Sequence, residues 1–146
     1  MNRKYIFLAA PISGFSNEKE YNKYRDKILC LIKYLRENLF IVYSEVERVT
    51  GESNYDSPSN SVENDFKRIC ESDVFLLLHP RKVQTSALIE LGFAYAKMKN
   101  IIIVGPKTAL PYLALGLPSV NSNVRIIDAA DLTVQTFEQI LATVYG

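Results

Sequence analysis

The sequence lacks the features that mark several common classes of protein. No run approaches the roughly 18–20 apolar residues that a membrane-spanning helix needs, and the formal net charge of +1 gives no field for nucleic acid. The start, MNRKYIFLAAP, is basic and then apolar, but its apolar run at residues 5–10 is shorter than a secretory core. We therefore expect a soluble, cytoplasmic protein that binds neither nucleic acid nor a membrane.

Cysteine and histidine are also scarce. Neither Cys30 nor Cys70 has a second cysteine or a histidine at metal-ligand spacing, so the sequence predicts no metal site and no cofactor. Both lie in apolar helical patterns, which predicts reduced, buried thiols. The single histidine, His79, directly precedes Pro80, and no Ser or Cys nucleophile with a strand–turn–helix elbow accompanies it. We expect a structural role for His79.

What the sequence does contain is a regular alternation of short apolar runs with amphipathic segments. Its 146 residues fit one domain, 1–146, without repeats or linkers. Branched-rich runs predict strands at residues 5–10, 39–43, 74–78, 101–104 and 123–127. Helical spacing predicts helices from Ser16 or Asn17 to about residue 37, and over 61–71, 85–98, 108–115 and 132–145, the fourth broken by Pro111 and stopped by Gly116. The fold class is α/β, a three-layer sandwich with a Rossmann/flavodoxin-like parallel sheet of about five strands.

Ligands of such sheets bind outside the carboxyl ends of the strands, so the loops at that edge are the candidate site. They are residues 9–16, the neighbourhood of Ser44–Glu45, and residues 79–86. The polar segment 44–60 is a long loop of the kind that forms lids or partner contacts, and we expect its Asp56 and Glu52 to be solvated.

Small residues in the first loop allow a ligand to approach backbone N–H groups, although a plain tight turn explains them equally well. The loop has no G-x-G-x-x-G run, so a dinucleotide fingerprint is not supported. Thr85 and Ser86 come at a helix N-terminus, where hydroxyls and N–H groups suit an anionic or sugar ligand, or simply cap the helix. The candidate substrate-binding residues are Ala9, Ala10, Pro11, Ser13, Gly14, Gln84, Thr85 and Ser86.

Two acids are the candidate catalytic residues. Glu90 lies in the first turn of the helix between two apolar runs, where a nucleophile or a ribose-binding carboxylate would be needed, although an acid there also complements the helix dipole. Asp65, on the helix before the third strand, can lean toward the same cleft. Paired carboxylates divide the roles of nucleophile and proton donor in glycoside cleavage.

Three segments, IFLAAPISG, ENDFKRICESDVFLLL and SALIELGFAYAKMKNIIIVG, together resemble the nucleoside 2-deoxyribosyltransferase-like family, which includes deoxynucleoside 5′-monophosphate N-glycosidases. The resemblance spans residues 5 to about 105, and its most specific piece is the ELG run with the small residues behind it. It implies that Glu90 is the nucleophile that attacks the sugar C1′ and that Asp65 positions or protonates the leaving base. Gly92 would let the helix pack close to the sheet.

The resemblance also implies a substrate class and an assembly. The expected partner is a small nucleoside or nucleotide, and a homo-oligomer is expected in which a subunit edge completes the pocket, through segment 44–60, the Tyr-rich first helix or the apolar tail. Gln84 stands where transferases of the family carry a second acid, which favours hydrolysis or an altered base preference. Three other functions stay open: a module that binds a nucleotide signal without turnover, related chemistry such as a nicotinamide-dinucleotide glycohydrolase resembling TIR domains, and a partner-binding role in a toxin or defence system.

Overall fold

A computed structural model describes residues 2–49 and 56–146. Five strands form one parallel sheet in the order β2-β1-β3-β4-β5, which confirms the predicted fold class. The strands are β1 Tyr5–Ala9, β2 Ile41–Tyr43, β3 Val74–Leu78, β4 Asn100–Gly105 and β5 Val124–Asp128. The α-helices are α1 Glu18–Glu37, α2 Pro58–Glu71, α3 Ala87–Ala96, α4 Tyr112–Val120 and α5 Val134–Tyr145, with short 3₁₀ turns η1 Glu45–Glu47 and η3 Lys107–Ala109.

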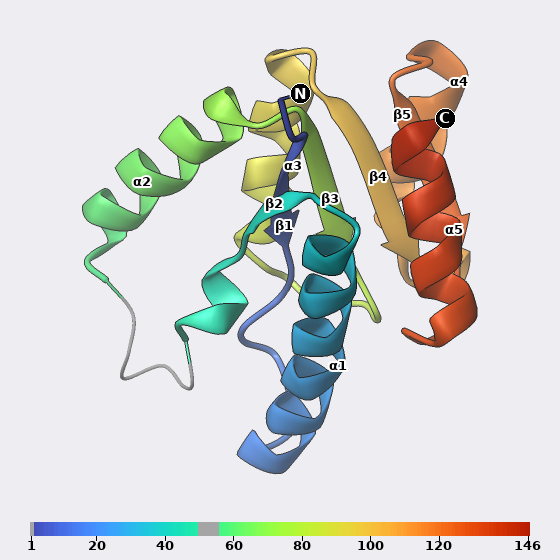
Figure 1. The fold of residues 1–146 in the computed structure, drawn as a ribbon. Helices are drawn as coiled ribbons and strands as arrows, with labels where there is room; N and C mark the ends of the chain where they lie inside the picture. The colour runs from blue at the N-terminus through green and yellow to red at the C-terminus, as the bar shows by residue number, and fades with distance from the viewer. Residues whose placement is uncertain (1, 50–55) are drawn as a thin grey trace.

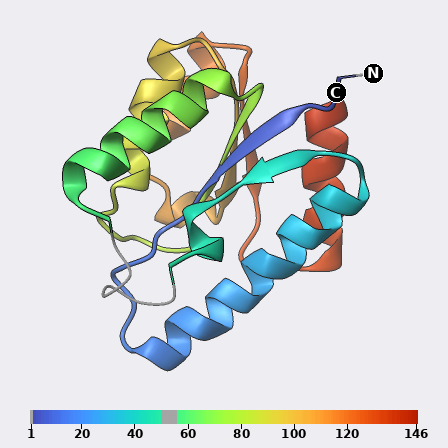
Figure 2. The same ribbon diagram turned by 60° about the vertical axis from the view of Figure 1, so that its left-hand side comes forward.

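Helices cover both faces of the sheet, as Figures 1 and 2 show from two sides. Helices α1 and α5 pack on one face, where Leu35 of α1 and Ile140 of α5 meet strand residues such as Leu76. Helices α2, α3 and α4 pack on the other, against residues such as Phe75. Every residue of β3 is buried, which explains why its sequence is an unbroken apolar run rather than an alternating one.

Local sequence signals set most helix ends. Asn17 accepts a hydrogen bond from the Glu20 backbone N–H at 2.8 Å, and the Glu20 carboxylate accepts one from the Ser16 N–H at 3.0 Å, so of the two predicted caps Asn17 is the one used. Helix α2 begins at Pro58 after the cap Ser57, three residues before the predicted start, because proline is well suited to the first turn. Residues 50–55 of the predicted loop lie outside the described residues.

Helix α4 differs from its prediction. Pro111 does interrupt the segment: η3 ends before it, and α4 starts directly after it. The helix is not stopped by Gly116, however, and runs through Pro118 to Val120. A Cβ added at Gly116 would meet nothing within 4 Å, so this glycine lies on an outer surface and needs no special backbone conformation.

Three further side-chain predictions are wrong. Gly92 is exposed, with open space around an added Cβ, so it does not bring α3 close to the sheet. Cys30 and Cys70 are both exposed, because each lies about 100° around its helix from an inward neighbour, Leu31 and Ile69.

His79 is buried at the end of β3, and its backbone N–H donates to the Val104 carbonyl at 2.8 Å, which fits a structural role. No helix within the described ranges is long and apolar enough to cross a membrane.

Candidate active site

A cavity of about 340 Å³ opens at the carboxyl edge of the sheet, above the end of β1. The strand order explains its place. Strand β1 lies between β2 and β3. The chain therefore passes from β1 to β2 on one side of β1 and then to β3 on the other side. Ligands of open parallel sheets bind at such a switch point. The walls come from the loop after β1, from η1, from α2 and from the first turn of α3.

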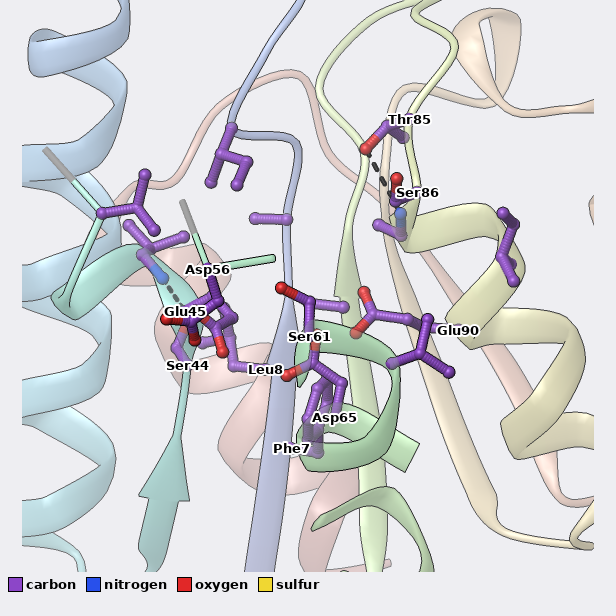
Figure 3. A pocket seen from close by; sticks show the side chains of 18 of the residues that line it. Phe7, Leu8, Ser44, Glu45, Asp56, Ser61, Asp65, Thr85, Ser86 and Glu90 are labelled. Atoms are coloured by element: carbon purple, nitrogen blue, oxygen red, sulfur yellow. Dashed lines mark hydrogen bonds between the residues drawn. The ribbon is translucent and has the colours of Figure 1, made fainter. Parts of the chain in front are cut away.

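Glu90 is the fourth residue of α3, and its carboxyl group points into this cavity (Figure 3). Two buried residues on the same helix, Leu91 and Ala94, fix α3 against the sheet. Burial raises the pKa of Glu90 to about 9, with further contributions from the charge of Asp65, a hydrogen bond to Asp65 and the charge of Glu45. The free site therefore holds Glu90 protonated at neutral pH.

Asp65 approaches the cavity from α2. The helix is anchored by Ile69, which is fully buried, and by Phe66, whose ring stacks on Phe93 of α3 with 4.0 Å between centroids. The stack joins α2 to α3 and so fixes Asp65 relative to Glu90. Burial, a hydrogen bond to Glu45 and the negative charge of Glu45 together raise the pKa of Asp65 to about 7.

The third carboxylate of the cavity is Glu45. From the sequence, only the neighbourhood of Ser44–Glu45 was predicted as part of the candidate site. It opens η1 directly after β2, where Ser44 accepts a hydrogen bond from the Val46 N–H at 3.3 Å. Burial raises the pKa of Glu45, but hydrogen bonds from Tyr43, Asp65 and Arg48 outweigh it and leave the pKa below its ordinary value. Glu45 is thus the ionised member of the group. The sequence feature that could have identified it is an acid placed directly after the end of a strand.

A chain of hydrogen bonds behind the cavity keeps Glu45 ionised. Arg68 donates from Nε to Asn64 Oδ1 at 3.2 Å, and Asn64 donates from Nδ2 to the Tyr43 hydroxyl at 2.8 Å. The Tyr43 hydroxyl in turn donates to Glu45. The Arg68 guanidinium also lies over the Tyr43 ring, 4.0 Å from its centroid.

The three carboxyl groups form a row in which Asp65 lies between Glu45 and Glu90 (Figure 3). Like charges this close cannot all ionise, so protons stay on the members that are most buried. Around neutral pH the row holds Glu45 ionised, Asp65 near its titration midpoint and Glu90 protonated. Such a group can both donate a proton and, once ionised, stabilise positive charge.

Asp56 is exposed, as predicted, while Glu52 lies outside the described residues. Asp56 also lines the cavity, and its carboxylate lies 3.1 Å from the Arg48 guanidinium. Arg48 also pairs with Glu45. The cation on this wall is therefore shared between two acids.

The predicted substrate-binding residues divide into two groups. Five line the cavity: Ala9, Ala10, Ser13, Thr85 and Ser86. Three others do not: Pro11, Gly14 and Gln84. Gly14 makes the turn of the first loop with a φ of +83°, a backbone conformation suited to glycine. Gln84 instead lines a separate, open hollow beside His79 and Tyr112.

The α3 N-terminus is already satisfied by its own chain. The Ala87 N–H donates to the Thr85 hydroxyl at 3.3 Å, and the Leu88 N–H donates to the Thr85 carbonyl at 3.1 Å. The Ile89 and Glu90 N–H groups donate to the Ser86 carbonyl at 3.0 and 3.2 Å. Thr85 is therefore the residue whose side chain caps this turn. Within residues 2–49 and 56–146, no group of three or more His, Cys, Asp or Glu side chains is arranged to hold a metal ion.

Several solved structures share this fold. The CMP N-glycosidase BcmB of Clostridium botulinum aligns with a TM-score of 0.72 and 24% identity, over 95% of this chain and 99% of that one. The solution structure of BlsM aligns with a TM-score of 0.76 and 21% identity, over 97% and 89%. A conserved protein from Enterococcus faecalis V583 aligns with a TM-score of 0.58 and 14% identity, over 95% and 99%.

No family model matches the sequence, and no curated protein matches it. At identities of 14–24% the structural likenesses show a common fold. They do not show a common activity, since one fold can host many activities.

Proposed function

We propose that the chain belongs to the nucleoside 2-deoxyribosyltransferase-like family and cleaves, or transfers at, the N-glycosidic bond of a nucleoside or nucleotide. The observation that carries the proposal is the pair Asp65 and Glu90, two carboxyl groups with raised pKa values that line one cavity. A neighbour of the same fold is named as a CMP N-glycosidase, and supports this reaction type.

In the proposed reaction Glu90 is the nucleophile and Asp65 the proton donor. A Glu90 carboxylate oxygen attacks C1′ while the electrons of the C1′–N bond leave with the base, whose nitrogen takes the proton of Asp65. The product is an ester between Glu90 and the sugar. Water, or a second base in a transferase, then attacks C1′, gives its proton to the Asp65 carboxylate and releases Glu90. Each of these two roles is worth roughly 10²–10⁴ in rate.

The free site holds its proton more tightly on Glu90 than on Asp65, the reverse of what attack requires. Positive charge that develops at C1′ stabilises the carboxylate beside it, which favours ionised Glu90. Because Asp65 and Glu90 lie close enough to shift each other's pKa, the proposal has the proton pass from Glu90 to Asp65 as substrate binds.

Release of free base from a panel of nucleosides and their 5′-monophosphates tests the proposal. We expect Glu90→Gln to reduce release by at least about 10³-fold, and Asp65→Asn by about 10²-fold. The exposed Glu138→Gln is the matched control and should keep full activity. Rapid-quench mass spectrometry should detect sugar bound to Glu90. Tight nucleoside binding without any base release would instead support a binding module.

The homo-oligomer expected from the sequence is part of the proposal. Helix α4 exposes large apolar side chains, Tyr112, Leu113 and Val120, of the kind that an interface covers. Sedimentation at micromolar concentration tests this, and a monomer throughout that range would remove it.

A further inference from the structure

The charges that line the cavity indicate which substrates it accepts. Among the described residues, its ionisable lining consists of Glu45, Asp56, Asp65 and Glu90 against a single cation, Arg48. That cation is engaged by Glu45 and by Asp56 at 3.1 Å. Glu90 is protonated in the free site at neutral pH, but Glu45, Asp56 and the partly ionised Asp65 still outnumber Arg48, so the cavity has an excess of negative charge.

The first turn of α3, which carries Glu90, does not compensate for this excess. A helix N-terminus binds an anion through N–H groups that have no other partner. In the first turn of α3, the N–H groups of residues 87–90 already donate to Thr85 and Ser86. Glu90 is itself on this turn, so an ionised Glu90 would repel a phosphate placed there. Besides the acids and Arg48, the lining offers a ligand the hydroxyls of Ser13, Ser61 and Ser86, because those of Ser44 and Thr85 already accept from backbone N–H groups.

From this charge arrangement we infer that the cavity takes an uncharged nucleoside rather than a nucleoside 5′-monophosphate. The inference rests on the proposed function and narrows its substrate class. A nucleoside presents sugar hydroxyls and base N–H groups, which donate to carboxylate oxygens at no electrostatic cost. A monophosphate brings up to two negative charges into a cavity where the fixed acids outnumber the cation. The acid Asp56 and its hold on Arg48 are therefore determinants of specificity.

Paired measurements on each nucleoside and its own 5′-monophosphate test the inference, because the two compounds share the same base and sugar and differ only in the phosphate. We expect kcat/KM for base release to be at least about tenfold higher for the nucleoside, and the difference to narrow as salt rises. Asp56→Asn removes one acid and loosens the hold on Arg48, so it should reduce the ratio several-fold. Asp26→Asn, on the exposed face of α1 away from the cavity, is the matched control and should leave the ratio unchanged.

A binding readout separates this inference from the reaction itself. The melting temperature of the protein is measured with the same ligand pairs, since a ligand that binds the folded state raises it. Nucleosides that stabilise without losing their base would support the inference and remove the proposed reaction. Faster cleavage of monophosphates would overturn the inference and keep the reaction. No stabilisation and no cleavage by either class would overturn both.

Discussion

The side-chain nitrogen of Asn64 donates a hydrogen bond to the hydroxyl of Tyr43 at 2.8 Å. The Asn64 oxygen is occupied by Arg68 at 3.2 Å, so the amide cannot turn around without losing a charge-assisted bond. With its oxygen accepting from Asn64, Tyr43 directs its own proton to Glu45. Three residues outside the reacting pair thereby hold one carboxylate ionised, and that charge raises the pKa of Asp65.

Replacing Glu45 should shift the pH dependence of the reaction. Burial, then the hydrogen bond and charge of Glu45, raise the pKa of Asp65 to about 7, so Glu45→Gln lets the pKa of Asp65 fall toward its ordinary value. Each unit of that fall reduces the protonated fraction of Asp65 about tenfold above its pKa. We expect lower activity at neutral pH and an acid limb displaced to lower pH.

Glu47→Gln is the control for this change. Glu47 lies on the same short helix η1 but pairs with Arg36 at 2.6 Å and does not line the cavity. It should leave both the rate and the pH profile in place. An acid limb that stays fixed in Glu45→Gln would show that Glu45 has only a structural role.

The pH profile of the unaltered protein should be bell-shaped. The reaction needs one proton on the pair Asp65 and Glu90, and the pair loses its protons with apparent pKa values of about 7 and about 9. Below the first value both carboxyl groups are protonated and no nucleophile is present. Above the second both are ionised and no donor remains. The rate of base release, measured from pH 5 to 10, should peak near pH 8.

Glu90 should also make the fold less stable in alkali. Its pKa in the folded state is raised to about 9, above the unfolded value, so its stability contribution is fully present below about pH 4.5 and is lost as pH rises toward 9. Glu90→Gln removes this dependence. We expect the variant to gain on the order of a few kcal/mol over the original near pH 9, and nothing comparable near pH 4.

Urea denaturation of both proteins across this pH range measures the difference. Glu138→Gln, whose side chain is exposed, should follow the original protein at every pH. A constant offset between Glu90→Gln and the original would contradict a buried carboxyl with a raised pKa.

The core that supports the site makes a separate prediction. Leu35 of α1 is fully buried against the sheet, so Leu35→Ala leaves a cavity and should cost about 2–5 kcal/mol of the free energy of unfolding. Val134, on α5, is 64% exposed, and Val134→Ala should change stability by less than about 0.5 kcal/mol. Equal losses for the two variants would contradict the described layers.

Elements with a strong local pattern were predictable from the sequence. Strand β3 was predicted without error, and β1 and β4 to within one residue at each end, because strands covered on both faces are unbroken apolar runs. Helix α1 follows from its cap Asn17 and its inward stripe. Asp65 and Glu90 were predicted as a pair from the helices that carry them and from the family resemblance, and the structure places both on one cavity.

Tertiary structure alone decided what surrounds that pair. The meeting of Glu45 with Asp65 and the sharing of Arg48 leave no trace in local periodicity. The physical reason is that a repeat of 3.6 or 2 residues fixes which face of an element is apolar, whereas neighbours across a cavity depend on strand order. Since β1 lies between β2 and β3, acids far apart in the chain come close enough to shift one another's pKa.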